Sequence, residues 1–351
     1  MTQAVVIATT ATEAPMGAQA YERAVTARAA TALGELGRAC PVREVVARSL
    51  RSPLDGNRRL PMRWLYSARP TPRRALGRVV YPAHSLVHRM DLVLPPPPGP
   101  DVVTLHDLVS WEFADESSPV EAAAVELRRA DAVICVSEFT ARQARERLRL
   151  TNVAVVHHGV DRRYFDPAPL DSKWLPEHGI LGPFFLYAGG SSARKNLAGL
   201  AAAWKAVSRQ LPDWQLVLAG PRSDSRTSLF ADSPRVVHLG RVDDAVMPSL
   251  VAAAACVVVP SHYEGFGLPA LEGMAAGVPV VSSNRSSLPE VVGDAGILVQ
   301  PTPEALGEGL LAVASESLDL VAMTERGRQR ARHFTWERSA DGHAAVWASL
   351  L

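Results

Sequence analysis

Two glutamates on either side of a glycine turn are the residues of this chain best suited to bind a ligand. Glu264 and Glu272 stand in the run from His262 to Gly273, after the apolar run Cys256–Val259. A helical pattern begins at Pro269, and a helix that opens from a glycine turn presents free backbone N–H groups to phosphate. Carboxylates accept hydrogen bonds from the hydroxyls of sugars and riboses. The stretch therefore predicts a nucleotide-sugar site.

The same turn also loosely matches the dinucleotide-binding fingerprint through Gly265, Gly267 and Ala270. That fingerprint normally follows the first strand of its domain, whereas several strand–helix units precede it here. An NAD-dependent oxidoreductase is therefore disfavoured. A glycine turn that serves only helix–strand packing is the other explanation of this spacing, and the flanking glutamates favour the ligand site.

A second glycine turn, Gly189 to Asn196, carries two adjacent cations, Arg194 and Lys195. It follows the apolar run Phe184–Ala188 and leads into an amphipathic pattern, which predicts a strand, a turn and a helix start. Cations at a helix N-terminus oppose the helix dipole, and a bound anion would relieve this. Arginine offers two parallel donors to a phosphate and lysine offers a point charge. The alternative is a solvated basic helix start.

These motifs, in this order, resemble the retaining glycosyltransferases of family 4, the glycosyl transferases group 1. The resemblance rests on Gly190–Asn196, Glu264–Glu272 and Gly277–Val281, and it is supported by Thr104–Leu108, Cys135–Phe139, His158–Asp161 and Ser287–Gly293. It covers residues 100 to 340 well and residues 1 to 99 more weakly. It implies the GT-B fold, an α/β fold in which two Rossmann-like doubly wound domains face a central cleft that holds the nucleotide-sugar.

The resemblance also implies a catalytic set and a donor-binding set. The catalytic residues would be His106, Arg194, Lys195 and Glu264, and the donor-binding residues would be Gly17, Gly190, Phe266, Gly267, Leu268 and Glu272. Glu272 would bind the ribose hydroxyls, and Glu264 would face the transferred sugar. Gly17 would let the first domain's turn approach the diphosphate closely. His106 would orient the donor sugar or stabilise the transition state, and the alternative is a strand-end histidine satisfied locally.

No metal ion or cofactor is expected. The chain has no Asp-x-Asp motif, and the nearest candidate, Asp243-Asp244, is typical of the start of a surface helix, where acids complement the dipole. His157-His158 is interpreted as structural, because no cluster has metal-ligand spacing. Arg194 and Lys195 can neutralise the leaving diphosphate instead. The donor is expected to be of the GDP-mannose or UDP-glucose type.

The expected activity is that of a retaining hexosyltransferase. It would move mannose or glucose from a nucleotide-diphosphate sugar to a carbohydrate or lipid-linked hydroxyl acceptor, in the synthesis of a polysaccharide, a glycolipid or a small glycoside. Two alternatives stay open, a GT-B protein that binds the nucleotide-sugar without turnover and a sugar-nucleotide epimerase. An epimerase would not be expected to combine the arginine–lysine turn with the glutamate pair.

The segment from Arg43 to Arg78 has a composition of its own. It holds ten arginines and no lysine, with Glu44 and Asp55 as its acids, and Trp64 and Tyr66 lie within it. Arginines with interleaved aromatic residues suit an anionic surface, which leads to the hypothesis of peripheral contact with an anionic membrane or a lipid-phosphate acceptor. The alternative is a solvated loop from a genome rich in arginine.

Composition limits the remaining function classes. The chain has 351 residues, a formal charge of +1 and 47% hydrophobic residues, which is typical of a globular protein and gives no case for nucleic acid. Cys40, Cys135 and Cys256 are widely spaced and predict free thiols in a reducing compartment. Met1 to Thr10 lacks a basic region, and no apolar stretch approaches the ~18 residues of a membrane span. A cytoplasmic location, peripheral on the membrane's cytoplasmic face, is expected.

Strands and helices alternate along the chain, which predicts parallel sheets with the ligand beyond the carboxyl ends of the strands. Three parts are expected: 1–165 for acceptor binding, 166–335 for nucleotide-sugar binding, and a terminal helix, 336–351, that crosses back to the first domain. Residues 167–182 are interpreted as a linker. The predicted strands are Gln3–Thr9, Val42–Ala47, Asp101–Leu105, Ala132–Val136, Val153–Val156, Phe184–Ala188, Gln215–Ala219, Val236–Leu239, Cys256–Val259, Val278–Ser282 and Ile297–Val299.

Overall fold

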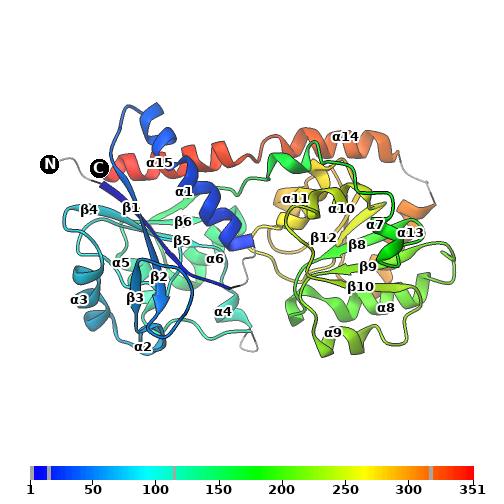
Figure 1. Ribbon diagram of the computed structural model, residues 1–351, viewed down its shortest axis with the longest axis horizontal. Helices are drawn as coiled ribbons and strands as arrows, with labels where there is room; N and C mark the ends of the chain where they lie inside the picture. The colour runs from blue at the N-terminus through cyan, green and yellow to red at the C-terminus, as the bar shows by residue number, and fades with distance from the viewer. Residues whose placement is uncertain (1–3, 14–16, 114–115, 316–318) are drawn as a thin grey trace. The chain divides into compact units, whose positions relative to one another are not determined.

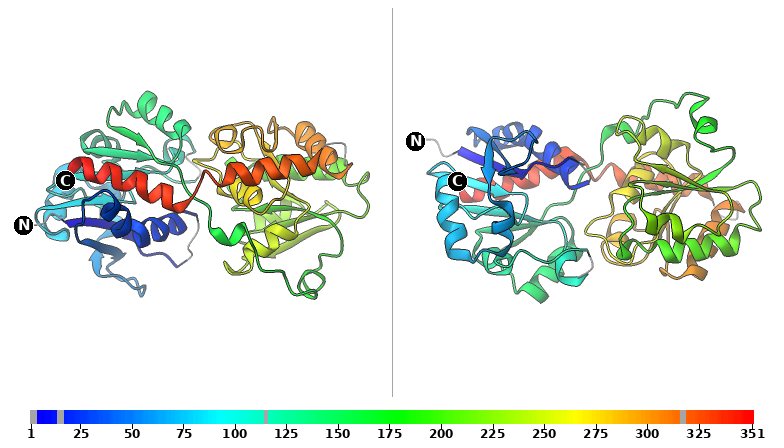
Figure 2. Two further views of the ribbon diagram at one scale, coloured as in Figure 1. Left: turned by 90° about the horizontal axis from the view of Figure 1, so that it is seen from above. Right: turned by 60° about the horizontal axis from the view of Figure 1, so that its bottom comes forward.

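The chain folds into two α/β units, each built around one parallel sheet. The computed structural model describes residues 4–13, 17–113, 116–315 and 319–351. The first unit consists of Met1–Gly159 with Trp336–Leu351, and the second of Val160–Thr335 (Figure 1). Helices cover both faces of each sheet, as the further views show (Figure 2). The predicted architecture of two Rossmann-like domains is confirmed.

The sheet of the first unit has seven parallel strands in the order β3-β2-β1-β4-β5-β6-β7. The strand order reverses at β1, which pairs with β2 on one side and β4 on the other. The strands are β1 (Ala4–Thr10), β2 (Val42–Ser49), β3 (Arg58–Leu60), β4 (Ser85–Arg89), β5 (Asp101–Leu105), β6 (Ala132–Cys135) and β7 (Val153–Val155). The helices are α1 (Gly17–Glu35), α2 (Met62–Ser67), α3 (Pro70–Val80), α4 (Val109–Glu112), α5 (Ala123–Arg129), α6 (Glu138–Leu148) and α15 (Trp336–Leu350).

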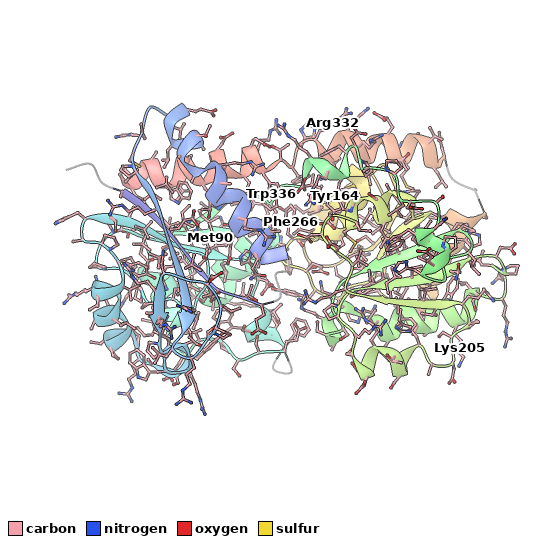
Figure 3. All side chains as sticks on the ribbon, viewed as in Figure 1. Met90, Tyr164, Lys205, Phe266, Arg332 and Trp336 are labelled. Carbon is pink, nitrogen blue, oxygen red and sulfur yellow. The ribbon has the colours of Figure 1, made fainter. Side chains whose placement is uncertain are left out.

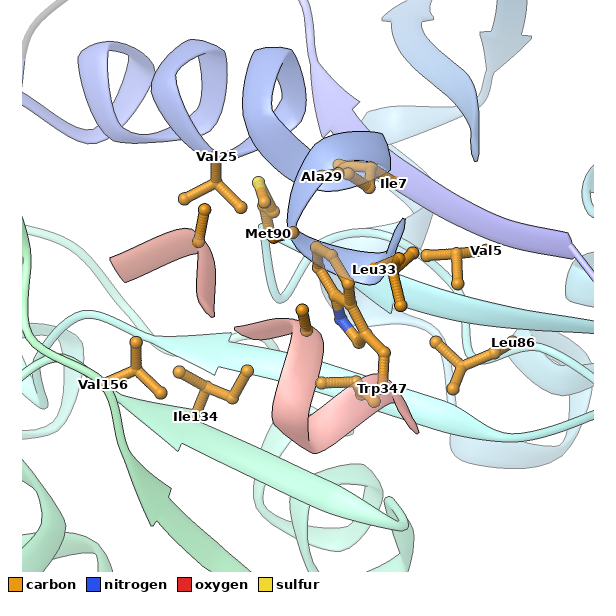
Figure 4. Packing of buried hydrophobic residues seen from close by; sticks show 14 of the residues in the cluster. Val5, Ile7, Val25, Ala29, Leu33, Leu86, Met90, Ile134, Val156 and Trp347 are labelled. Carbon is orange, nitrogen blue, oxygen red and sulfur yellow. The ribbon is translucent and has the colours of Figure 1, made fainter. Parts of the chain in front are cut away.

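The C-terminal helix α15 is part of the first unit's core. It packs beside α1 on one face of the sheet, where Trp347 is fully buried. Its indole lies among apolar side chains of the sheet and of α1, including Leu86 and Leu33 (Figure 4). Burying an aromatic side chain of this size stabilises the unit by a few kcal/mol, about 1.5–3 by transfer of its apolar surface. The last helix is therefore held in place by packing and not only by its own hydrogen bonds.

The boundary between the units lies a few residues before the expected position at 165. The Val160 N–H donates to the Phe334 carbonyl at 3.0 Å, and Val160 pairs with Thr335 as an isolated parallel bridge. The short 3₁₀ helix η1 (Arg162–Tyr164) packs against α10 and α11 of the second unit. Backbone pairing thus assigns 160–165 to the second unit, which apolar patterning alone did not indicate.

The sheet of the second unit has six parallel strands in the order β10-β9-β8-β11-β12-β13. The strands are β8 (Phe184–Ala188), β9 (Gln215–Ala219), β10 (Val236–Gly240), β11 (Cys256–Val259), β12 (Val280–Ser283) and β13 (Ile297–Val299). The helical elements are η1, α7 (Trp174–Glu177), η2 (Ala193–Lys195), α8 (Leu197–Val207), α9 (Asp224–Leu229), α10 (Met247–Ala253), α11 (Leu268–Ala275), α12 (Leu288–Val292), α13 (Pro303–Ala314) and α14 (Leu320–Ala331). The expected linker over 167–182 contains the helix α7.

Two strands of the first unit, β3 and β4, were not predicted. The strand β4 is buried along its whole length although it contains His88 and Arg89. Arg89 donates to Asp101 at 2.8 Å and to Glu126 at 3.1 Å, so its charge is compensated inside the unit. Charged residues within a short apolar run normally indicate a surface segment. Their partners lie far along the chain, which is why the sequence pattern was misleading here.

No helix in the described ranges combines the length and the apolar character that crossing a bilayer requires. The three cysteines are free; Cys135 and Cys256 are buried, and Cys40 is partly buried.

Candidate functional site

The two glycine turns meet at one edge of the second unit's sheet. The strand order reverses between β8 and β11, which are hydrogen-bonded neighbours. The turn Gly189–Lys195 follows β8, and the turn Ser261–Gly267 follows β11. Because carboxyl ends of parallel strands share an edge, both turns lie at the position where open α/β sheets bind ligands.

Asn196 fixes the first turn to the second. Its backbone is left-handed, with a φ of 56°, and its Oδ1 accepts a hydrogen bond from the Gly199 N–H at 3.2 Å, which caps α8. Its Nδ2 donates to the carbonyl oxygens of Pro260 at 3.0 Å and Pro301 at 2.9 Å. One buried amide thus joins three segments of chain and sets the position of the two cations directly before α8.

The structure brings three of the expected catalytic residues into contact. Lys195 Nζ donates to both carboxylate oxygens of Glu264, at 2.7 and 2.8 Å. Arg194 Nη1 donates to the Tyr263 carbonyl at 3.1 Å and lies 3.4 Å from Glu264 Oε2. The Ser261 hydroxyl donates to Glu264 Oε1 at 2.7 Å. We refer to Arg194, Lys195 and Glu264 as the cation cluster.

The cation cluster is partly buried and positively charged. Glu264 is 7% exposed, and burial by itself would raise its pKa, but Lys195 and Arg194 hold the pKa below its usual value. The side chains of Arg194 and Lys195 are 17% and 15% exposed. Two cations against one carboxylate give these three side chains a net charge of 2 − 1 = +1. Charges in such a desolvated setting interact strongly with a bound anion.

The turn before α11 has a backbone that only glycine adopts readily. Gly267 has a φ of 109°, and a Cβ at this position would lie 2.7 Å from Leu288 Cδ2. The Ser287 hydroxyl lies 2.9 Å from the Glu264 carbonyl oxygen and 2.7 Å from that of Phe266. Phe266 is buried, as expected for a residue whose main chain and not its side chain faces a ligand. The helix α11 then begins at Leu268, so the turn is rigid and opens into a helix N-terminus.

Glu272, the second glutamate of the motif, has a different environment from Glu264. It lies on α11, is partly buried, and forms a hydrogen bond with Tyr164, which precedes the second unit's first strand. Burial raises the pKa of Glu272 to about 7, and the carboxylates of Asp244 and Asp161 add to the rise. The sequence analysis missed Tyr164, although it closely follows the segment His158–Asp161 of the family resemblance.

The two expected donor-binding glycines outside this turn gain less support from their local structure. The Gly190 carbonyl accepts a hydrogen bond from the Tyr187 hydroxyl at 2.6 Å. A Cβ on Gly190 would meet no atom within 4 Å, so packing does not require glycine there. Gly17 is the first residue of α1 and is exposed, and the preceding residues 14–16 lie outside the described part of the chain.

His106 lies in the first unit, directly after β5. Its ring is 5.0 Å from the Tyr21 ring in an edge-to-face arrangement and 5.5 Å from the His158 ring. Burial lowers the pKa of His106 to about 4, so the imidazole is neutral at pH 7. Its buried Nε2 has no hydrogen-bond partner among residues 4–13, 17–113, 116–315 and 319–351. The neighbouring Asp107 accepts a hydrogen bond from the Val109 N–H at 3.0 Å.

Tyr21 connects His106 to a buried polar network that the sequence analysis did not find. The Tyr21 hydroxyl lies 2.7 Å from Thr104 Oγ1 and 2.7 Å from His343 Nε2, and His88 Nε2 lies 2.8 Å from the same threonine. Burial lowers the pKa of His343 to about 4 and holds the pKa of His88 well below its usual value. These residues come from α1, β4, β5 and α15, so no local pattern in the sequence joins them.

Asp243, the expected helix-start residue, caps a turn before α10. Its Oδ1 accepts a hydrogen bond from the Ala245 N–H at 2.8 Å. The Asp244 carbonyl accepts from Arg163 Nη1 at 3.1 Å. Among the described residues, no group of three or more histidines, cysteines, aspartates and glutamates could hold a metal ion.

Two family models match this chain. The model described as "Glycosyl transferases group 1" matches residues 182–316, and the model described as "Glycosyltransferase Family 4" matches residues 44–164. The first match includes the whole cation cluster and Glu272, and the second includes His106.

Among curated relatives, the O-antigen chain mannosyltransferase B of Escherichia coli is 40% identical over 162 residues, 44% of this chain and 42% of that protein. The GDP-mannose-dependent alpha-(1-6)-phosphatidylinositol dimannoside mannosyltransferase of Mycobacterium tuberculosis is 30% identical over 232 residues, 63% of this chain and 58% of that protein. The chain thus aligns with only about half the length of these relatives.

Solved structures share the fold over the whole chain. Sucrose-phosphate synthase from Thermosynechococcus elongatus is 21% identical with a TM-score of 0.74, and the match covers 99% of both chains. The Anabaena protein HepE in complex with UDP-glucose is 19% identical with a TM-score of 0.68, covering 99% of this chain and 100% of that chain. At these identities the likeness shows the GT-B fold.

Proposed function

Because this chain belongs to the glycosyltransferases of group 1 and family 4, we propose that it transfers a hexosyl group from a nucleoside diphosphate sugar to a hydroxyl acceptor, with retention of configuration. The observation that carries the proposal is the cation cluster at the strand-order reversal of the second unit. Two preorganised cations beside a helix N-terminus are suited to a diphosphate that gains negative charge as it leaves.

Charge development on the leaving group explains why two cations are needed. The reaction breaks the bond between the anomeric carbon and a phosphate oxygen, and the electron pair stays with the diphosphate. Arg194 and Lys195 stabilise that charge, and losing one such preorganised donor typically costs about 3–4 kcal/mol of transition-state stabilisation. With both cations in place, we propose that transfer proceeds without an essential metal ion or another cofactor.

Glu264 is proposed to position the cations and to face the transferred sugar, without forming a covalent intermediate. Its carboxylate already accepts hydrogen bonds from Lys195 and Ser261, and the nearby cations lower its pKa. A carboxylate with engaged lone pairs and a low pKa is a weak nucleophile. We therefore propose that the acceptor hydroxyl attacks the anomeric carbon as its proton passes to the departing phosphate oxygen.

Two further residues are proposed to contact the donor, Glu272 in the second unit and His106 in the first. Glu272 would accept hydrogen bonds from the ribose hydroxyls, with Tyr164 orienting its carboxylate. His106 is proposed to orient the donor sugar through one hydrogen bond, because its imidazole is neutral and its Nε2 has no partner among the described residues. The main-chain N–H groups of the turn at Gly267 would contact sugar hydroxyls and phosphate.

The relatives suggest which donors to test first. Two of them are named mannosyltransferases and one is named GDP-mannose-dependent, while the HepE structure contains UDP-glucose. We propose GDP-mannose as the first donor candidate and UDP-glucose as the second. The acceptor is proposed to be a carbohydrate or a lipid-linked glycan.

The basic segment of the first unit is proposed to contact an anionic membrane peripherally, on its cytoplasmic face. Trp64 and Tyr66 on α2 are 42% and 53% exposed, and arginines such as Arg63 beside them are exposed too. Arg73 is an exception, because it is fully buried and pairs with Glu126 at 2.7 Å. Exposed aromatic residues among arginines are typical of a surface that meets anionic headgroups.

Cosedimentation with vesicles tests the membrane contact. The chain should pellet with vesicles of anionic phospholipid at low salt and not with zwitterionic vesicles. Replacing Trp64 and Tyr66 by serine should reduce pelleting, whereas Leu181→Ser, which changes an apolar residue that is 81% exposed in the second unit, should not. Equal pelleting with both kinds of vesicle, or none, would refute the contact.

A nucleotide panel tests the transferase proposal. Thermal unfolding is measured with GDP, UDP, ADP and their sugars, each with and without EDTA. A ligand at 100 times its Kd stabilises the folded state by about 2.7 kcal/mol, which is easily detected. The proposal predicts a shift for one base that survives EDTA and is reduced by Lys195→Met. No shift with any nucleotide would contradict it, and binding without sugar transfer would favour a nucleotide-sugar-binding protein.

A further inference from the structure

One buried arginine of the second unit lacks the acidic partner that the other buried arginines have. Among the described residues, Arg73, Arg89 and Arg226 are buried. Arg73 pairs with Glu126 at 2.7 Å, and Arg89 pairs with Asp101 at 2.8 Å. Arg226, on α9 and only 2% exposed, pairs with no carboxylate of the described residues. The second unit therefore holds a desolvated positive charge that its own acids do not compensate.

The contacts of Arg226 are few for a buried guanidinium. One Nη donates to the Gly189 carbonyl oxygen, and the guanidinium carbon lies 5.6 Å from the centre of the Tyr187 ring. Its Nε is buried and has no hydrogen-bond partner in the described part of the chain. Leaving a buried donor on a charged group unpaired costs a few kcal/mol, about 1–3 or more. A buried donor of this kind calls for an explanation, and a bound water, ion or ligand is one.

Arg226 lines a recess that is built from positively charged side chains. The recess has a volume of about 260 Å³ and lies at the carboxyl ends of β9 and β10. Arg222 and His238 also line it, and no acidic residue does. Burial, Arg226 and Arg222 together lower the pKa of His238. The two arginines on its wall therefore favour a negatively charged occupant.

The backbone around the recess depends on two glycines. Gly220 and Gly240 line it, and both have left-handed φ angles, of 129° and 74°. A Cβ on Gly220 would lie 2.1 Å from the Gly189 carbonyl oxygen, so glycine is required at that position. The chain can thus bring Arg226 and the turn after β8 together without a side chain between them.

We propose that this recess is a second anion site of the second unit, in which Arg222 and Arg226 bind a phosphate group. Guanidinium groups bind phosphate oxygens through paired N–H donors, and Arg222 and Arg226 both line the recess, with Arg222 the more exposed of the two. The Thr227 hydroxyl and His238 add polar contacts at the wall. The site is separate from the cation cluster, since none of the cluster's three residues lines the recess.

Two sources of phosphate fit this chemistry, free inorganic phosphate and the phosphate of a larger ligand such as a nucleotide. The proposal does not depend on the transferase function, because it rests on the buried charge and the recess. It has one consequence for the neighbouring turn: Arg226 holds the Gly189 carbonyl, so an anion in the recess shares a guanidinium with the turn that carries the cation cluster.

Calorimetric titration of the full chain with inorganic phosphate, at constant ionic strength and in EDTA, tests the proposal. The unmodified chain should bind phosphate, and Arg222→Ala should weaken binding about tenfold, the loss of one charge-assisted contact. Arg209→Ala, which removes an exposed arginine of the same unit outside the recess, serves as the matched control and should not change binding. Lys195→Met should still bind phosphate, because this change leaves the recess intact.

A second readout covers the buried residue, whose replacement can disturb folding. Arg226→Lys keeps the charge and removes the Nε donor, and it should weaken phosphate binding while the unfolding transition stays cooperative. In parallel, NMR of ¹⁵N-labelled histidine should show that phosphate raises the pKa of His238, and that Arg222→Ala abolishes this rise. His238→Gln identifies the resonance.

The possible outcomes distinguish the two sources of phosphate, and they distinguish a failure of the recess proposal from a failure of the transferase proposal. If phosphate and a nucleoside diphosphate bind at the same time, the occupant of the recess is free phosphate. If the two ligands compete and Arg222→Ala weakens the binding of both, the occupant is the nucleotide's own phosphate. Either result supports the site. No phosphate binding overturns the proposal. Phosphate binding that Lys195→Met abolishes and Arg222→Ala leaves unchanged would also overturn the recess proposal. That result would leave the transferase proposal intact.

Discussion

The contact between Lys195 and Glu264 yields the most quantitative prediction of this account. Lys195→Met removes the ammonium group that donates to both oxygens of Glu264, at 2.7 and 2.8 Å. Glu264→Gln removes the negative charge and keeps the shape of the side chain. The two changes are made singly and together, so that their coupling can be measured.

The size of the effect follows from burial. The side chains of Lys195 and Glu264 are 15% and 9% exposed, so the pair is close to fully buried. Removing one partner of a buried ion pair typically costs about 3–5 kcal/mol, and we expect the lower end because Arg194 and Ser261 still donate to Glu264. For a unit of this size, ~3 kcal/mol corresponds to a fall in Tm of roughly 6–12 °C.

The pH dependence of this cost has a definite sign. In the intact cluster the pKa of Glu264 is lowered, so the pair's contribution to stability is present above the unfolded-state pKa and is lost as the pH falls through the folded-state pKa. In Lys195→Met, the ammonium group that lowers the pKa of Glu264 is gone, so burial raises this pKa relative to that of the unmodified chain. Protonation then relieves the uncompensated charge, so the stability gap between the two proteins should narrow from pH 7 to pH 5.

The assay is urea unfolding and calorimetry of the four proteins of the cycle, with Lys205→Met as the control. Lys205 is an exposed lysine on α8 that lies away from Tyr164 and Phe266 of the site (Figure 3). Its replacement should change the free energy of unfolding by less than about 0.5 kcal/mol. The double variant should cost less than the sum of the singles, by an interaction energy of about 1–3 kcal/mol. Additive singles, or equal effects at Lys195 and Lys205, would refute the reasoning.

Three further predictions concern the turns and the second glutamate. Gly267→Ala should lower stability by roughly 1–3 kcal/mol through its left-handed φ and the contact with Leu288, whereas Gly190→Ala should be nearly neutral, and calorimetry compares the two. Asn196→Ala should cost about 2–3 kcal/mol in urea unfolding, because it loses a helix cap and two hydrogen bonds to carbonyls. The pKa of Glu272 is about 7, and its ionised form accepts hydrogen bonds from ribose hydroxyls better than its protonated form does. Calorimetric titration should therefore show that nucleotide affinity rises from pH 6 to pH 8 and that Glu272→Gln reduces this rise. An unchanged pH profile in this variant would contradict the ribose role.

The sequence predicted those parts of the site that are built from residues close together along the chain. The turn after β8 and the turn after β11 each follow a short apolar strand, and their glycines and cations stand next to each other in the sequence. Once both strands are recognised as parallel neighbours, their carboxyl ends must lie at one edge. The proximity of Arg194 and Lys195 to Glu264 follows from that geometry. The ion pair between Lys195 and Glu264 was not predicted.

Contacts between distant segments are what the sequence did not reveal. The strand β4 was missed because Arg89 looks like a surface residue until Asp101 and Glu126 are known to be its partners. The network from Tyr21 to His343 joins residues 322 positions apart, and no periodicity encodes it. Arg226, which has no carboxylate partner among the described residues, was not predicted for the same reason, since an arginine in a helix of six residues normally faces water.

Release of nucleoside diphosphate from GDP-mannose and UDP-glucose, in EDTA and with simple sugar and glycolipid acceptors, tests the central claim most directly. The comparison uses the unmodified chain, Lys195→Met and the control Lys205→Met. The account predicts that one donor is consumed by the unmodified chain and by Lys205→Met, while Lys195→Met is slower by about 10²–10³-fold, the effect of losing one preorganised donor to developing charge. Equal rates in all three proteins, or turnover only when a divalent metal is added, would contradict the account.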